Sequence, residues 1–514
     1  MWPIFISLIQ LAFISLTLVG LSAWAHRSLH ISEHSALVVA AAIYAALSMA
    51  QFWIAWAFLP LRWPSTLLTL AICIPMIAAG VRAVREQSFL HRISWPMGLY
   101  LAATVILLLW VHAVSGDISP LREAANRWTH SLPGDNAIPL DFARGFAEGV
   151  IPTPLHATWL SSDRPPLQTA MFMLTPGFLI AGADLWAYQA AGVAFQLLIL
   201  IAAWALAMAM TDQRRIAIVS VAALFFTPIV LVNGAYVWPK LLAATFVNGA
   251  ITLYFYSDKS VSKKTVLYGP LLGLLAALAM LSHGGTVFVA IGIIPLVLLR
   301  PYRVGIRTGM IAVSVSASML APWILYQTFA DPPGNRLVKW HLAGVEVIDD
   351  RTVPEALIQA YENMPIQAQL RHREANLNVL LKAPWSVNEK TWDAIAELKN
   401  QNRQGIQEIL REIRKKQFFY MTMGMGFLGL TLYLLPLYLL DPQTRIISLT
   451  ALMSLTVWVL LKFPAGSTTI HQGSLYPPIV IILLALTWLG MRSITLMIAV
   501  ACVHIILTIF IYLI

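Results

Sequence analysis

The residues best suited to chemistry lie in a polar segment, residues 116–168, that interrupts an otherwise apolar sequence. One of its carboxylates, Asp117, is a candidate for a general base that takes a proton from an acceptor hydroxyl. Asp117 follows closely on an apolar run that ends at Val114, and carboxylates at the rim of hydrocarbon are costly to retain without a function. A solvated turn is the alternative explanation, because a Ser-Pro pair follows.

A second group of interest closes the same segment, where Asp163 and Arg164 precede a Pro-Pro-Leu sequence. The two prolines fix the backbone and allow a helix to begin at Leu167. An arginine beside the free amides of a helix N-terminus can bind a phosphate. A rigid junction with a local ion pair explains the same spacing equally well.

The composition places these residues in a membrane protein. The chain is 59% hydrophobic and 11% charged, with a mean hydropathy of +0.73. The formal charge of +10 comes from short basic clusters between apolar runs, which membrane topology explains better than nucleic-acid binding. No GxxxxGK[ST] sequence occurs, which argues against a nucleotide-driven pump and against a nucleotide-sugar donor.

Apolar runs long enough to cross a bilayer recur throughout the chain and predict an all-α polytopic membrane protein with about 14 transmembrane helices and two outer-face loop regions. The predicted spans are 2–24, 36–60, 66–81, 96–114, 185–210, 216–232, 240–257, 265–282, 284–299, 305–325, 417–440, 446–462, 476–490 and 493–513. Basic connectors, such as those with Arg27, Arg85 and Arg214, should then lie on the inner side. This assignment requires that residues 166–180 lie on or dip into the outer interface without crossing.

The same pattern predicts four regions: additional N-terminal transmembrane helices (1–95), a core (96–325) with a first outer loop at 115–184, a second outer-face segment (326–416), and C-terminal transmembrane helices (417–514). Near the end of the second segment, the spacing of apolar residues predicts an amphipathic helix. Its two apolar sets are Trp392, Ile395 and Leu398, then Ile406, Leu410 and Ile413.

Several short motifs resemble the GT-C glycosyltransferases both in their order along the chain and in their predicted position on the outer side of the membrane. The resemblance is to the branch that contains the protein O-mannosyltransferases and the lipid A aminoarabinose transferase. The motifs are the carboxylates at the start of the first loop, the Pro-Pro-Leu sequence after Arg164, the Trp238-Pro239-Lys240 turn, the Ser282-His283 turn, Pro322-Trp323, and the sequence from His471 to Pro477. The resemblance covers roughly residues 96–490.

The resemblance implies an inverting single displacement that moves a sugar from a polyprenyl-phosphate donor to an envelope glycan, lipid or protein. Arg164 then resembles the residue that holds the lipid phosphate, and Asp117 the base. This sequence has Asp117-Ile118 in place of an adjacent acidic pair, so the base stays open between Asp117, Glu123 and Asp141. The expected substrate-binding residues are Asp163, Arg164, Lys240, His283, Arg336, His471 and Tyr476.

The resemblance also makes Asp141 and Asp163 second carboxylates that could bind the acceptor or, through their oxygens, a divalent cation such as Mg²⁺ or Mn²⁺. No outer-face histidine spacing indicates a protein-held metal. The resemblance further implies a multi-pass protein of the bacterial inner membrane, with its active site on the periplasmic face. A lipid-linked glycan flippase, and an O-antigen ligase or polymerase resting on the second segment, are the alternative functions.

Overall fold

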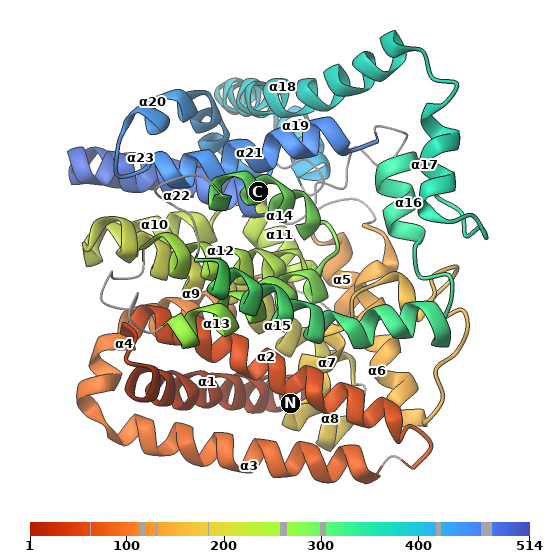
Figure 1. Cartoon of the computed structure of the whole chain (residues 1–514). Coiled ribbons are helices and arrows are strands. Elements are labelled where there is room, and N and C mark those ends of the chain that lie inside the picture. Colours follow the sequence, from red (N-terminus) through yellow and green to blue (C-terminus); the bar gives the residue numbers. More distant parts are fainter. Residues whose placement is uncertain are drawn as a thin grey trace.

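The computed structural model describes residues 1–61, 63–113, 119–128, 132–182, 184–256, 265–298, 305–417, 423–463 and 475–513. Within these ranges the chain is built of helices and loops, and no β-strand is present. Long helices lie side by side, while six short helices gather toward one end of the bundle, on the right in Figure 1. They are α5 (Pro120–Asn126), α6 (Ile138–Glu148), α7 (Leu167–Met173), α8 (Pro176–Ala181), α16 (Arg336–Ala343) and α17 (Val353–Tyr361). We call this end the loop end.

The long apolar helices match the predicted class of protein. They are α1 (Trp2–Leu29), α2 (Glu33–Ala57), α3 (Trp63–Arg85), α4 (Gln87–His112), α9 (Leu185–Thr211), α15 (Ile306–Leu325) and α23 (Ile494–Leu513). These seven are long and apolar enough to cross a membrane, and an eighth span exists if α10 (Arg214–Phe225) and α11 (Pro228–Tyr236), bent by 61°, form one.

The remaining predicted spans correspond to shorter apolar helices: α12 (Lys240–Tyr256), α13 (Thr265–Ser282), α14 (Thr286–Leu298), η5 with α20 (Met423–Leu434 and Leu435–Leu440), α21 (Arg445–Leu461) and α22 (Tyr476–Arg492). The all-helical class is therefore confirmed for the described residues, and several of their helices could span a membrane, whereas the total of 14 spans stays a prediction. The two cysteines, Cys73 and Cys502, are unpaired.

Helix α9 is the centre of the packing. It is apolar on all sides, which is typical of a helix enclosed by others, and it contacts α1, α2, α4, α10 and α12. Its two buried glutamines provide polar attachment points: the Gln196 amide donates to the Gln168 side chain at 2.8 Å, and the Gln189 amide donates to the Ala235 carbonyl at 2.8 Å. These two bonds attach α7 and α11 to α9.

Residues 166–180 differ from the prediction of an interfacial helix. They form two short helices, α7 (Leu167–Met173) and α8 (Pro176–Ala181), and neither is long enough to cross a bilayer. Helix α7 is fully enclosed and packs on α2, α6 and α9. Its backbone is held from within the protein, because the Tyr44 hydroxyl donates to the carbonyls of Met171 and Leu174. The apolar residues of α7 thus face protein and not lipid.

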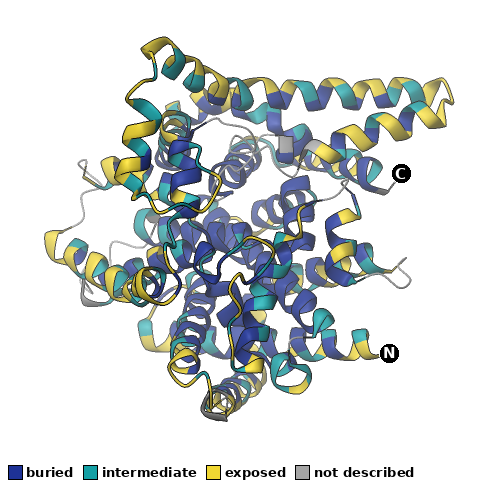
Figure 2. Cartoon of the chain, turned by 90° about the vertical axis from the view of Figure 1, so that its right-hand side faces the viewer, coloured by how far each residue is buried: buried dark blue, intermediate teal, exposed yellow. Residues whose placement is uncertain are grey.

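The segment after α15 holds η4 (Tyr326–Ala330), α16 (Arg336–Ala343), α17 (Val353–Tyr361), α18 (Ile366–Lys399) and α19 (Arg403–Gln417). Helices α18 and α19 form a long antiparallel pair along the top of Figure 2. The second apolar set, Ile406, Leu410 and Ile413, is buried as an amphipathic helix requires. From the first set, however, Trp392 and Leu398 face outward, with 60% and 50% of their surfaces exposed.

At the end opposite the loop end, ion pairs connect two basic connectors. Arg27, in the last turn of α1, pairs with Glu86 between α3 and α4. Arg92 in α4 pairs with Glu33 at the start of α2, at 2.8 Å. These pairs place the two connectors on one side of the bundle, as the distribution of basic residues predicts.

Candidate anion-binding site

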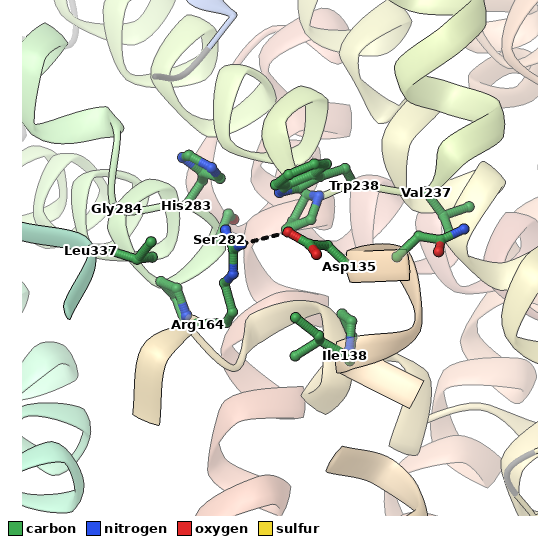
Figure 3. Close-up of a pocket in the computed structure, with 13 residues that line it drawn as sticks. Asp135, Ile138, Arg164, Val237, Trp238, Ser282, His283, Gly284 and Leu337 are labelled. Atoms are coloured by element: carbon green, nitrogen blue, oxygen red, sulfur yellow. Dashed lines mark hydrogen bonds and ion pairs between the residues drawn. The ribbon is translucent and has the colours of Figure 1, made fainter. Parts of the chain in front are cut away.

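A small pocket, partly open to solvent, lies at the loop end (Figure 3). Four separate segments and α16 contribute to its wall. The lining residues are Asp135, Asn136, Ile138, Pro139, Arg164, Pro165, Val237, Trp238, Pro239, Ser282, His283, Gly284 and Leu337. The pocket therefore joins the end of the polar segment to the two turns that the motif comparison singled out.

Arg164 is the main cation of the pocket wall. One of its terminal nitrogens donates to Asp135 Oδ2 at 2.7 Å, and its side chain is only 13% exposed. The guanidinium carbon lies 4.3 Å from the centroid of the Trp159 ring and 5.2 Å from that of Trp238. Its buried Nε donates to none of the described residues. Arg164 thus keeps donor capacity for a ligand.

Burial destabilises the charged form of this group. It lowers the pKa of the Arg164 guanidinium from its ordinary value, while the Asp135 carboxylate acts in the opposite direction. Arginine nevertheless stays protonated in proteins. An anion that entered the pocket would supply part of the solvation that the buried guanidinium has lost.

His283 lines the pocket, and Lys240 lies beside it without being one of the lining residues. Lys240 begins α12, is 2% exposed and places Nζ 4.9 Å from the Trp238 ring centroid. It lies close enough to Arg164 for their charges to interact. His283 follows the end of α13 and accepts a hydrogen bond from the Gly285 amide on Nδ1 at 3.0 Å. Its Nε2 then carries a proton and is a donor.

The turn that carries Trp238 is held in an uncommon conformation. Helix α11 ends at Val237, whose φ of 52° lies in the left-handed region that β-branched residues rarely adopt. The Gln168 amide donates to the Val237 carbonyl at 2.6 Å and to the Tyr188 hydroxyl at 2.7 Å. The surroundings therefore impose this conformation, and such imposed strain clusters at functional sites.

Asp163 and Arg336, both predicted to bind substrate, lie beside the pocket and not in its wall. Asp163 Oδ2 accepts a hydrogen bond from the Leu160 amide at 2.9 Å and lies 3.7 Å from Arg336. Arg336 donates to the carbonyls of Thr158 and Glu346, each at 2.8 Å. These contacts attach α16 to the loop that carries Arg164.

The described base candidates have other partners. Glu123 in α5 (Pro120–Asn126) is 2.8 Å from His112. Asp141 in α6 (Ile138–Glu148) lies 2.8 Å from Arg144 and 2.7 Å from His156. Neither carboxylate is among the residues that line the pocket.

Three further predicted residues complete the comparison. The Tyr476 hydroxyl lies 2.6 Å from that of Thr450, between α22 and α21, and this tyrosine is not among the described residues of the pocket wall. Asp117 and His471 lie outside the described residues. Their predicted roles stay predictions.

Sequence reasoning missed Asp135 and Trp159 as parts of the site. Asp135 in η1 (Gly134–Ala137) is separated from Arg164 by 29 positions, and its Pro-Gly-Asp context reads as an ordinary turn. Trp159 lay within the polar segment, where an isolated indole among prolines and serines could have indicated a stacking surface for the nearby arginine.

The carboxylates proposed to hold a divalent cation do not fit one. Asp141 and Asp163 are each matched with arginine or histidine side chains of the protein. In the described part of the chain, no group of three or more His, Cys, Asp or Glu side chains is arranged to hold a metal. We therefore derive no chemistry through a cation.

Comparisons of the chain with protein-family models, with curated proteins and with solved structures find no match. The resemblance to the GT-C glycosyltransferases therefore remains a prediction from short motifs. The chemistry of the pocket carries the functional proposal.

Proposed function

We propose that the chain is a membrane glycosyltransferase of the GT-C type, which moves a sugar from a polyprenyl-phosphate donor to an extracytoplasmic acceptor. One observation carries the proposal: Arg164 is buried against two indoles, pairs with one carboxylate and retains an unused donor beside Lys240. A planar guanidinium held in this way suits a phosphate group, which it can contact with two parallel hydrogen bonds.

The membrane setting favours a lipid-linked phosphate over a soluble one. Several helices of the chain are able to span a bilayer, and the pocket is lined by turns at the loop end of the bundle. We propose that this end faces the periplasm of a bacterial inner membrane, because the connectors with Arg27 and Arg92 lie at the other end. The lipid phosphate would then sit at the depth of the headgroups.

In the proposed reaction, an acceptor hydroxyl oxygen attacks the anomeric carbon as the bond from that carbon to the phosphate oxygen breaks. The phosphate leaves with the bonding electron pair, and Arg164, Lys240 and the His283 Nε2 proton stabilise its growing negative charge. A carboxylate takes the hydroxyl proton. A single displacement of this kind inverts the anomeric configuration.

Asp135 joins the candidates for the proton acceptor. Among the described residues of the pocket wall it supplies the carboxylate, and its bond to Arg164 involves Oδ2. When a phosphate competes for Arg164, Asp135 becomes available to accept a proton. Asp117 is retained as a second candidate on its sequence position.

The proposal is tested with purified protein in nanodiscs, using a panel of synthetic polyprenyl-phosphate sugars and measuring release of polyprenyl phosphate and direct binding of the donor lipid. Arg164→Ala should weaken lipid binding by about tenfold or more, the value of a lost charge-assisted hydrogen bond. Arg144→Ala is the matched control, because Arg144 belongs to the same segment, is 41% exposed and pairs with Asp141 outside the pocket.

The control variant should bind and react like the wild type. Equal binding by the wild type and Arg164→Ala would remove the basis of the proposal. Translocation of the lipid without release of polyprenyl phosphate would identify a flippase instead.

A further inference from the structure

Lys462 is a second buried cation near the pocket. It follows α21 directly, and 0% of its surface is exposed. Its Nζ lies 2.7 Å from His341 Nδ1, so that a hydrogen bond joins the end of α21 to α16. An ammonium group that makes one such bond retains two N–H donors.

The backbone around Lys462 is fixed from two sides. The Asn376 amide of α18 donates to the Lys462 carbonyl at 2.8 Å and to the Val459 carbonyl at 3.0 Å. The Phe463 amide donates to the His341 carbonyl at 2.8 Å. These backbone bonds already join α16, α18 and α21. The ammonium group of Lys462 is therefore not needed for that connection.

The Lys462–His341 pair lies on the same side of α16 as the pocket. His341 comes one helical turn after Leu337, which lines the pocket, and residues four apart share a helix face. Lys462 is also close enough to Lys240 for their charges to repel. Lys240 thus lies close enough to both Arg164 and Lys462 for their charges to interact.

The positive charge of Lys462 has no carboxylate partner among the described residues. Residues 464–474, which follow it, contain no Asp or Glu in the sequence. Lys339 provides the contrast within α16: its side chain is equally buried, but Nζ lies 2.6 Å from Asp349. A buried cation without a counter-ion is strongly unfavourable. An anion bound beside Lys462 would stabilise the charged form of this side chain.

We infer that Lys462 and His341 form a subsite for a second phosphoryl group, next to the one at Arg164. This inference rests on the proposed function, because it extends the same pocket. The second group has two chemical sources: the distal phosphate of a polyprenyl diphosphate donor, or a phosphate on a separate molecule bound beside a monophosphate donor. Both would be held by the same Nζ–H donors.

The test measures binding of three probes to the full-length protein in nanodiscs: polyprenyl monophosphate, polyprenyl diphosphate of the same chain length, and inorganic phosphate added after saturation with the monophosphate lipid. The wild type should bind the diphosphate about tenfold or more tightly than the monophosphate if both groups belong to one lipid. It should instead bind inorganic phosphate beside the monophosphate lipid if the second group comes from another molecule.

Lys462→Met should abolish the tighter binding of the diphosphate lipid or the binding of inorganic phosphate, whichever the wild type shows. The affinity for the monophosphate lipid should change by no more than about twofold, which is small compared with the tenfold loss expected for one missing interaction. Lys462→Arg should restore the signal. Lys339→Met controls for loss of a buried lysine from the same region and should retain it.

The outcomes separate the two proposals. A Lys462→Met variant with the full wild-type signal overturns the second subsite and leaves the proposed function intact. Unchanged monophosphate binding in Arg164→Ala overturns the proposed function. A wild type that binds none of the three probes overturns both.

Discussion

Arg164 and Arg336 stack on the same indole, that of Trp159, with guanidinium carbons 4.3 and 4.0 Å from its centroid. Their hydrogen bonds differ in kind. Arg336 donates to backbone carbonyls of two loops, whereas Arg164 donates to the Asp135 side chain at the pocket wall. One arginine therefore holds the loop in place, and the other is presented to the pocket.

Substitution by lysine should separate these two roles, because lysine keeps the charge but loses the planar fork and the stacking. Arg164→Lys should weaken binding of a polyprenyl monophosphate by about tenfold, with little change in Tm. Arg336→Lys should lower the Tm by several degrees and affect binding less. Lipid binding and thermal unfolding in nanodiscs check both. The reverse assignment of effects would contradict the division of roles.

The carboxylate that takes the proton can be found by comparing single amide substitutions. Asp135→Asn should lower the rate of sugar transfer by about 10²-fold or more, the usual contribution of a general base. Asp141→Asn should leave the rate close to that of the wild type, because Asp141 is paired outside the pocket. Transfer rates from a polyprenyl-phosphate sugar decide the matter. Loss of transfer in Asp117→Asn alone would assign the base to Asp117.

Asp163 should make stability depend on pH. Burial raises the pKa of this carboxyl above its ordinary value, and Oδ1 accepts no hydrogen bond from the described residues. The folded protein then holds this proton more tightly than the unfolded chain does. The contribution of Asp163 to the free energy of unfolding is therefore complete at pH values below the pKa of the unfolded chain, and it is lost as the pH rises through the pKa of the folded protein.

Asp163→Asn, which keeps an acceptor for the Leu160 amide, should therefore raise the Tm at pH 7.5. The difference from the wild type should shrink as the pH falls toward 4, and thermal unfolding at several pH values measures it. A variant that is less stable than the wild type at neutral pH would show that the contact with Arg336 outweighs burial.

The two buried lysines should respond oppositely when their charges are removed in the absence of ligand. Lys462→Met removes an ammonium without a described carboxylate partner and should stabilise the protein, by about 1–4 kcal/mol if it behaves like other replaced buried charges. Lys339→Met should destabilise it, because bonds to Asp349 and to the Arg351 carbonyl are lost. Tm values of the ligand-free proteins check this prediction. A fall in Tm for both variants would contradict it.

The sequence was sufficient to predict the all-helical class and the helix that begins at Leu167, just after Arg164, because both depend on local features. Apolar runs report spans directly, and two prolines after Arg164 fix the backbone there. Asp135 could not be found in this way, since its contact with Arg164 forms only when distant turns meet. The Lys462–His341 contact spans 121 positions and is subject to the same limit.

The burial of polar side chains was equally hard to predict where their hydrogen-bond partners are distant in the sequence. The distribution of basic residues predicts an interfacial helix at 166–180, yet the Gln168 amide is satisfied by the Val237 carbonyl and the Tyr188 hydroxyl inside the protein. Conversely, the apolar residue Trp392 faces outward on α18, although helical spacing groups it with core positions. Periodicity identifies an apolar face but not what covers it.

Two exposed tryptophans of α18 bear on how the protein meets the membrane surface. Trp385 and Trp392 are 65% and 60% exposed, and tryptophan side chains settle at the level of lipid headgroups. Such a pair would anchor α18 at the membrane–water interface.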